Sequence, residues 1–279
     1  MSARAALRAA WSALWTFGFA VLLTAATSGI WSGLFVANLR TTPAVPWGSA
    51  AMALFLVTLF TFLHGSWGGR RTRQTRRALL RARSVSVAVF AWALLAGLLG
   101  VVALSGLWIV LFQLVKMPGN SSNFSGVPEV TLVCSLVMAA LSGAITEEAG
   151  FRGYFQGTLE RYISAPAAIA LAALAMIPEH ASTQGFVWST IVFYLIFDVT
   201  MGTIAFLARS ILPGIVIHFI GLMVFFGLIW PNDRARVPVA LHGAGPWFWI
   251  HLSQAIVFAL LSFGALLQLA RIRLQSEAV

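Results

Sequence analysis

Residues 85–115, VSVAVFAWALLAGLLGVVALSGLWIVLFQLV, decide the fold because they form a long apolar run without a single charged residue. A helix needs about 20 apolar residues to cross the hydrocarbon core of a bilayer. This run exceeds that length, and its composition is typical of a transmembrane helix. We therefore expect residues 85–115 to span a membrane.

The rest of the chain has the same character. Of its 279 residues, 59% are hydrophobic and only 9% are charged, whereas soluble domains carry roughly 25% charged residues. Further apolar runs of spanning length bring the expected transmembrane helices to about eight, at approximately 11–37, 46–67, 85–115, 129–150, 164–182, 186–208, 211–230 and 247–270. The chain shows no internal repeat, so we expect an all-α, polytopic membrane helix bundle that forms a single transmembrane domain over residues 1–279.

The placement of the basic residues predicts how the chain is oriented. Cytoplasmic loops of membrane proteins are enriched in Lys and Arg. With a cytoplasmic N-terminus, most basic residues fall on the inner side, and only Arg40, Lys116, Arg234 and Arg236 fall outside. We therefore predict an integral, multi-pass protein with both termini in the cytoplasm, in the plasma membrane if the host is a bacterium.

The formal net charge of +10 raises the question of a nucleic-acid partner. The densest basic segment is an expected loop over 68–84, which lies at the predicted inner membrane surface and contains Arg70, Arg71, Arg73, Arg76, Arg77, Arg81 and Arg83. Basic segments beside a transmembrane helix are typical of contact with anionic lipids. We therefore expect membrane lipids as partners and no nucleic acid.

Ionisable residues inside predicted spans point to a functional site. Such a residue costs an estimated 2.5 kcal/mol or more to place in the bilayer, so it calls for a partner or a function. Six of them gather in or beside the spans from 129 to 230: Glu147, Glu148, Glu179, His180, Asp198 and His218. We expect this concentration to mark the site.

The sequence Glu147-Glu148-Ala-Gly-Phe-Arg152 predicts different roles for its two adjacent carboxylates. On a helix, residues four apart lie on the same face, whereas adjacent residues point about 100° apart. Glu148 and Arg152 are therefore predicted to pair, and Glu147 is left to act as a base. The alternative is an ordinary ion pair at the inner end of the helix.

A single membrane histidine is more often an interhelical hydrogen-bonding residue than a catalyst, but His180 and His218 together with the glutamate pair favour catalysis.

These residues resemble the CPBP family (CAAX protease and bacteriocin-processing, also called Abi) of intramembrane peptidases over approximately 130–230. The family motif EExxxR is complete in Glu147, Glu148 and Arg152. The motif FxxxH keeps His180 but has Met176 in place of the aromatic residue, and HxxxN or HxxxD keeps His218 but has Leu222 in place of the polar residue.

The resemblance implies an endopeptidase, similar to the CAAX-processing prenyl proteases, that cleaves a membrane-associated protein or peptide. Glu147 would be the general base that activates a water molecule, assisted by His180, while Glu148 and Arg152 hold the local geometry. His218 would donate to the developing oxyanion. Asp198 either replaces part of the function missing at position 222 or, as we expect, pairs with Arg209 or His218.

No cofactor follows firmly from the sequence. The helical zinc motif HExxH is absent, and the candidate ligands for a divalent metal such as zinc are Glu147, Glu148, His180 and His218. We favour a reaction without metal.

Two other classes of function stay open. The departures at Met176 and Leu222 are compatible with a weakened or inactive family member that acts as an immunity or scaffolding protein. Membrane carboxylates and histidines also occur in proton-coupled transporters. We find no inverted repeat and no pair of broken helices of the kind that transporters show.

Overall fold

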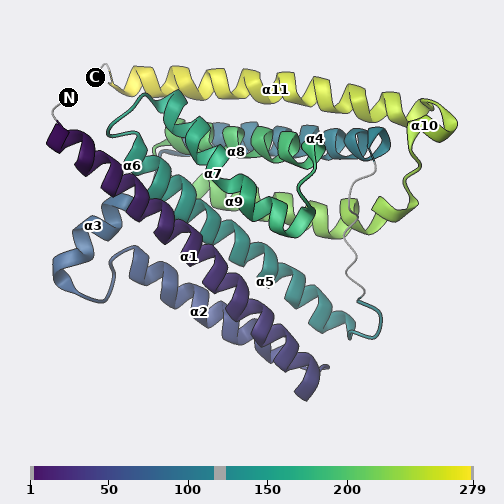
Figure 1. The fold of residues 1–279 in the computed structure, drawn as a ribbon, viewed down its shortest axis with the longest axis horizontal. Coiled ribbons are helices and arrows are strands. Elements are labelled where there is room, and N and C mark those ends of the chain that lie inside the picture. The colour runs from purple at the N-terminus through teal and green to yellow at the C-terminus, as the bar shows by residue number, and fades with distance from the viewer. Residues whose placement is uncertain (1–2, 116–123, 278–279) are drawn as a thin grey trace. The chain divides into compact units, whose positions relative to one another are not determined.

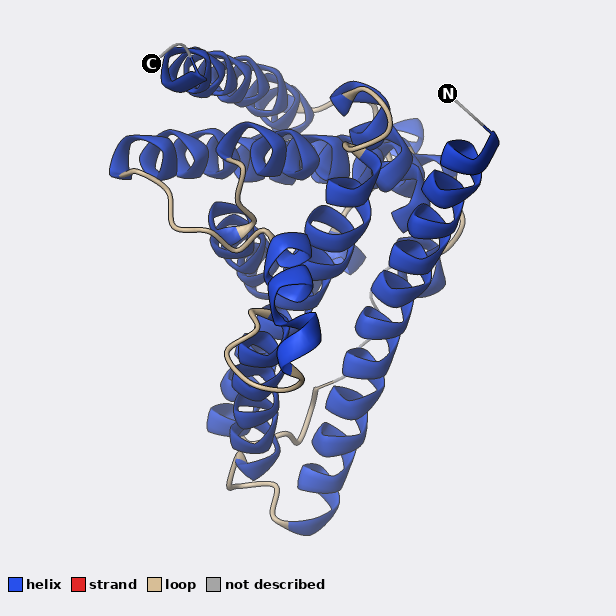
Figure 2. Ribbon diagram, turned by 90° about the vertical axis from the view of Figure 1, so that its left-hand side faces the viewer, coloured by secondary structure: helices blue, strands red, loops and turns tan. Residues whose placement is uncertain are grey.

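The computed structural model describes residues 3–115 and 124–277, and all regular elements among these residues are helices (Figure 1, Figure 2). Seven of the described helices are long and apolar enough to cross a membrane. An eighth apolar helix, Trp47–Leu63, has 17 residues and is shorter than the others. The predicted all-α membrane bundle of about eight helices is therefore confirmed.

One compact unit lies within residues 1–83 and 122–168. It contains α1 (Ala3–Thr41), α2 (Trp47–Leu63), α3 (Arg70–Leu80), α5 (Glu129–Glu147), the π-helix η1 (Glu148–Gln156) and α6 (Gly157–Leu159). Helix α1 packs against α2, α5 and η1. The buried Asn38 fixes the turn after α1, because its side-chain amide donates to the carbonyls of Thr42 and Val45 and its oxygen accepts from the backbone N–H of Gly48.

The arginine-rich segment 68–84 is not the expected loop, because most of it forms helix α3. Its Arg, Gln, Ala and Leu residues all have high helix propensity, so the segment folds as a helix once an end is anchored. Arg76 supplies that anchor: its Nε donates to the Phe62 carbonyl at 2.9 Å, and its Nη2 donates to the Trp67 carbonyl at 2.6 Å. Its guanidinium carbon also lies 4.2 Å from the centre of the Phe62 ring.

The second compact unit lies within residues 84–121 and 169–279. It contains α4 (Val87–Leu114), most of α7 (Ala165–Gln184), α8 (Trp188–Ala208), α9 (Leu212–Val224), the π-helix η2 (Phe225–Ile229), the 3-10 helix η3 (Trp230–Ala235), α10 (Val239–His242) and α11 (Pro246–Glu277). Helix α4 contacts α8, α9 and α11. Glycines permit the contacts with α9 and α11, because a Cβ at Gly97 would collide with Ile217 and one at Gly106 would lie 2.7 Å from the His251 carbonyl.

The helix ends differ from the predicted spans in a consistent way. Helices α1 and α11 extend beyond the predicted spans 11–37 and 247–270 into segments that carry arginine. Arginine favours a helix but falls outside an apolar window, so hydropathy alone predicts these two helices shorter than they are. Of the basic residues assigned to the outer side, Lys116 lies outside the described residues.

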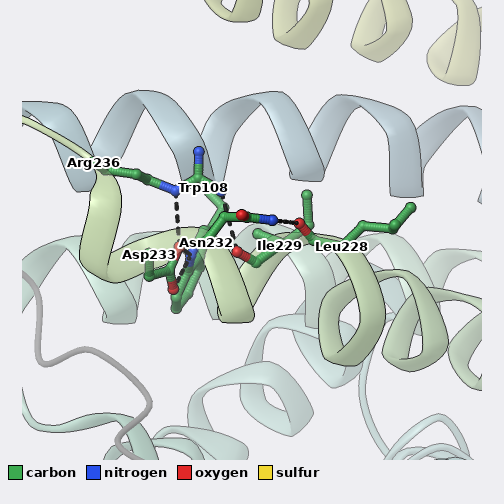
Figure 3. Close-up of polar contacts among 6 residues, drawn as sticks. All are labelled: Trp108, Leu228, Ile229, Asn232, Asp233 and Arg236. Carbon is green, nitrogen blue, oxygen red and sulfur yellow. Dashed lines mark hydrogen bonds and ion pairs between the residues drawn. The ribbon is translucent and has the colours of Figure 1, made fainter.

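A buried carboxylate fixes the end of the span Leu212–Asp233 (Figure 3). Asp233 is 1% exposed and accepts hydrogen bonds from the indole Nε1 of Trp108 at 3.2 and 3.1 Å. Arg236 donates from Nε to Asp233 at 2.9 Å and from Nη2 to the Ile229 carbonyl at 3.1 Å. The indole also packs edge-on against Phe193 and Phe225. The carboxylate thus joins α4 to η3.

We predict that Trp108→Phe destabilises the protein, because it removes the indole donor and leaves part of a buried carboxylate unsatisfied. Losing a hydrogen bond to a charged group costs about 1.5–3 kcal/mol. Thermal unfolding in detergent should show a lower midpoint than for wild type. The matched control is Trp11→Phe, because Trp11 is 66% exposed, and an equal effect of the two substitutions would contradict the role given to the Trp108–Asp233 bond.

Candidate active site

The predicted glutamate motif lies where an α-helix changes into a π-helix. Helix α5 ends at Glu147, and Glu148–Gln156 form η1. π-helical turns are rare and occur frequently at functional sites. Glu147 is partly buried, whereas Glu148 is fully buried. The change in helix type therefore falls between the two adjacent carboxylates to which the sequence assigns different roles.

The predicted pairing of Glu148 with Arg152 is confirmed. Arg152 Nε lies 3.7 Å from Glu148 Oε1, and both side chains are almost completely buried. A buried charge is tolerated when an opposite charge compensates it, and removing one partner of such a pair is strongly destabilising. Glu148 and Arg152 are therefore suited to fixing the conformation of η1.

Further polar contacts fix the end of the same helix. Gln156, which is fully buried, donates from Nε2 to Glu160 Oε1 at 2.8 Å. Glu160 in turn forms an ion pair with Arg81 at 3.1 Å. The π-helix is thus tied to the residue that follows α3.

Close backbone packing holds η1 against its neighbours. A Cβ built on Gly150 would lie 3.0 Å from Ala20 of α1, and one on Gly153 would lie 2.7 Å from the carbonyl oxygen of Leu80. Only glycine allows such an approach without displacing the backbone. A larger residue at Gly150 or Gly153 would therefore displace η1 from α1 or from the end of α3.

The second unit contains the two predicted histidines. His180 on α7 lies with its Nε2 3.4 Å from Asp198 Oδ2 on α8. The two atoms are close but not aligned as a hydrogen bond. Catalytic contacts are often long or poorly aligned in structures without substrate. His180 also stacks on Tyr194, with ring centres 3.9 Å apart and an interplanar angle of 8°. Tyr194 and Asp198 are one helical turn apart, so the same face of α8 supplies both contacts.

His218 on α9 is 3% exposed, and its ring meets Phe197 of α8 edge-on at 4.9 Å. One turn later, Leu222 places an apolar side chain where the resembled family has an amide or carboxylate. On α7, Met176 is fully buried one turn before His180. Its side chain occupies a core position where the family motif has an aromatic residue.

The candidate metal ligands do not gather within either unit. Among the described residues of each unit, no group of three or more His, Cys, Asp or Glu side chains is placed to hold a metal ion. Glu148 is already compensated by Arg152, and His180 lies beside Asp198. Neither unit alone therefore fits a zinc site built from the four candidates.

Two features of the site escaped the sequence analysis. The pairing of Asp198 with His180 was not among the partners considered for Asp198, although the spacing of Tyr194 and Asp198 shows that they share a face. The hydroxyl of Tyr154 is buried without a hydrogen-bond partner among the described residues. Tyr154 lies two residues after the EExxxR motif and packs against Phe19 with ring centres 4.6 Å apart, and nothing in the sequence pattern distinguishes it.

The chain was also compared with known proteins. No significant match was found among curated proteins or among solved structures. Residues 129–224, which are less than half of the chain, match the model of the family described as type II CAAX prenyl endopeptidase Rce1-like. This range contains Glu147, Glu148, Arg152, His180 and His218. The family resemblance carried by the glutamate motif is thereby confirmed: residues 129–224 of this integral membrane protein are similar to the CAAX prenyl endopeptidase family.

Proposed function

We propose that this protein is an intramembrane endopeptidase that cleaves a membrane-associated protein or peptide, with a prenylated CAAX-like tail as the leading substrate class. The observation that carries the proposal is the buried Glu148–Arg152 pair, which fixes a π-helix beside Glu147 inside the segment that matches the endopeptidase family. Such a pair assigns one carboxylate to structure and leaves the adjacent one for proton transfer.

The proposed reaction is the addition of water to the scissile amide. Glu147 accepts a proton from the water molecule as its oxygen attacks the carbonyl carbon, which forms a tetrahedral oxyanion. His218 donates a hydrogen bond to that oxyanion. When the C–N bond breaks, the proton held by Glu147 passes to the leaving amine, so that the enzyme returns to its starting state.

His180 assists the same water molecule, and Asp198 holds its ring. A carboxylate beside an imidazole selects the ring orientation and stabilises the protonated form, as in other hydrolases that use a histidine. The stacking of Tyr194 on the His180 ring supports this role, because it limits ring rotation. We propose Asp198 as a positioning residue for His180.

Leu222 bears on the rate of the reaction, and the pairing of Glu148 bears on whether a metal ion takes part. Leu222 offers no donor to the oxyanion, and one missing donor typically lowers the rate by about 10²–10³. The protein would then be a slow peptidase rather than an inactive one. We propose a reaction without metal, because Glu148, one of the four candidate ligands, is compensated by Arg152.

The orientation that we propose keeps the N-terminus in the cytoplasm. In the first unit, α1 begins and α2 ends at segments rich in arginine, whereas the opposite end of α1 carries Arg40 alone in its last turn. The enrichment of cytoplasmic loops in Arg supports this orientation. Cysteine labelling of intact cells at either end of α1 would test it.

We predict that Glu147→Gln and His180→Ala each lower kcat on a farnesylated peptide with a CAAX ending by about 10²–10⁴-fold, the usual contribution of general acid–base catalysis. Cleavage by purified protein in detergent, followed by mass spectrometry, measures the effect. Glu129→Gln is the matched control, because Glu129 is exposed at the start of α5.

Chelation with 1,10-phenanthroline should leave the wild-type rate unchanged if the reaction needs no metal. Cleavage at the wild-type rate by Glu147→Gln would exclude Glu147 as the base. A cellular phenotype that survives Glu147→Gln would favour the alternative of a non-catalytic immunity or scaffolding protein.

We predict that Asp198→Asn lowers kcat by on the order of tenfold or more, as for other carboxylates that orient a histidine, with little change in KM. Asp198→Glu should recover part of the rate, because it restores the negative charge. Asp233→Asn is the matched control: it removes the other buried carboxylate of the second unit, and should lower the unfolding temperature without changing kcat of the folded protein. An unchanged kcat for Asp198→Asn would refute the positioning role.

A further inference from the structure

Helix α3 carries more arginines than its contacts with the rest of the protein involve. Of its five arginines, Arg76 is buried and bonded to backbone carbonyls. The other four, Arg70, Arg71, Arg73 and Arg77, are exposed. None of these four has an ion-pair partner among the described residues. We call these four arginines the basic face of α3.

The surrounding sequence cannot supply the missing negative charge. The first acidic residue of the chain is Glu129, so residues 1–128 contain neither Asp nor Glu. In the same unit, Glu148 pairs with Arg152 and Glu160 pairs with Arg81. The described ion pairs of this unit therefore leave the basic face without an acidic partner, and an anion from outside the protein can supply the counter-charge.

The arginines of the basic face repel one another. Arg70 and Arg73 are three residues apart, and Arg73 and Arg77 are four apart, so both pairs are neighbours on the helix surface. Like charges at these spacings destabilise a helix. A bound anion would relieve this repulsion, which gives the basic face an intrinsic preference for a negatively charged partner.

The helix is fixed in place before any partner arrives. In its second half, Arg76 binds the carbonyls of Phe62 and Trp67, at the end of α2 and in the turn that follows it. At its end, the Leu80 carbonyl contacts Gly153 of η1, and Arg81 pairs with Glu160. A surface that is already ordered loses little conformational entropy on binding.

The position of α3 identifies the partner as lipid. The helix follows the apolar helix α2 after the short turn 64–69, so it cannot move far from the membrane surface. Trp67 in this turn is half exposed, and its indole donates to the carbonyl of Thr58 and the hydroxyl of Thr61. Tryptophan in such a place is typical of the membrane–water interface. The anions concentrated at that depth are phospholipid phosphates.

We propose that the basic face of α3 is a binding surface for anionic phospholipid headgroups. Each guanidinium group presents donors in a fork that matches phosphate oxygens. Because α3 contacts η1 directly through Leu80 and Gly153, a bound headgroup also stabilises the π-helix. The proposal concerns binding alone and does not depend on the proposed peptidase activity.

The test is a titration of the full-length protein, in neutral detergent, with dioctanoyl phosphatidylglycerol by isothermal titration calorimetry. A basic residue near anionic lipid contributes about 1 kcal/mol. The variant Arg70→Gln/Arg71→Gln/Arg73→Gln/Arg77→Gln should therefore bind on the order of 10²-fold more weakly or more. Raising the salt concentration should weaken wild-type binding, because the sites are exposed.

Two further variants separate the basic face from net charge and from misfolding. Substituting lysine at the same four positions keeps the charge but removes the guanidinium fork, so it should bind more tightly than the glutamine variant and more weakly than wild type. The matched control Arg4→Gln/Arg8→Gln/Arg40→Gln/Arg161→Gln removes four exposed arginines of the same unit outside α3, and should bind nearly as wild type does. Binding lost equally in this control would overturn the assignment to α3.

Titrations with other ligands identify which ligand the basic face prefers. Dioctanoyl phosphatidylcholine should not bind at the concentrations used for phosphatidylglycerol. Inorganic phosphate that binds as tightly as the lipid would overturn the choice of headgroup over free anion. A short single-stranded RNA that displaces the lipid at physiological salt would overturn the choice of lipid over nucleic acid. Wild-type affinity in the glutamine variant would overturn the proposal as a whole.

Discussion

A charged side chain inside a bilayer has to find its partner within the protein, because no water is present in the hydrocarbon core to solvate it. The described ion pairs follow this constraint. Glu148 is compensated by Arg152, His180 lies beside Asp198, and Asp233 accepts from Trp108 and Arg236. In each case, the residue that contacts the ionisable side chain also holds a helix in place. The rigidity of the candidate site is a consequence of this solvation problem.

The same constraint explains which parts of the structure were predictable. Apolar runs locate the transmembrane helices, because the bilayer selects for them residue by residue. The Glu148–Arg152 pair was predictable as well, since both residues lie on one helix and the spacing of four decides their contact. Local rules are sufficient for features of this kind.

Contacts between distant segments were not predictable in this way. Trp108 and Asp233 are 125 positions apart, and His180 and Asp198 lie on different helices. Their pairing depends on how helices pack, which a single sequence does not specify. The change from α-helix to π-helix at Glu148 also left no local pattern. The segment 68–84 shows the opposite error: a polar composition suggested a loop, but helix propensity and the anchoring of Arg76 produced a helix.

The glycines at Gly97, Gly106, Gly150 and Gly153 set the spacing of helices at which an added methyl group would collide with a neighbour. In lipid, where burial of apolar surface contributes little to helix association, such close approach is a main source of packing energy. Leu171 and Leu174, by contrast, are exposed apolar residues on the spanning-length helix α7. Exchange among apolar residues at such exposed positions is therefore expected to cost little, whereas a larger side chain at any of the four glycines would collide with a neighbouring helix.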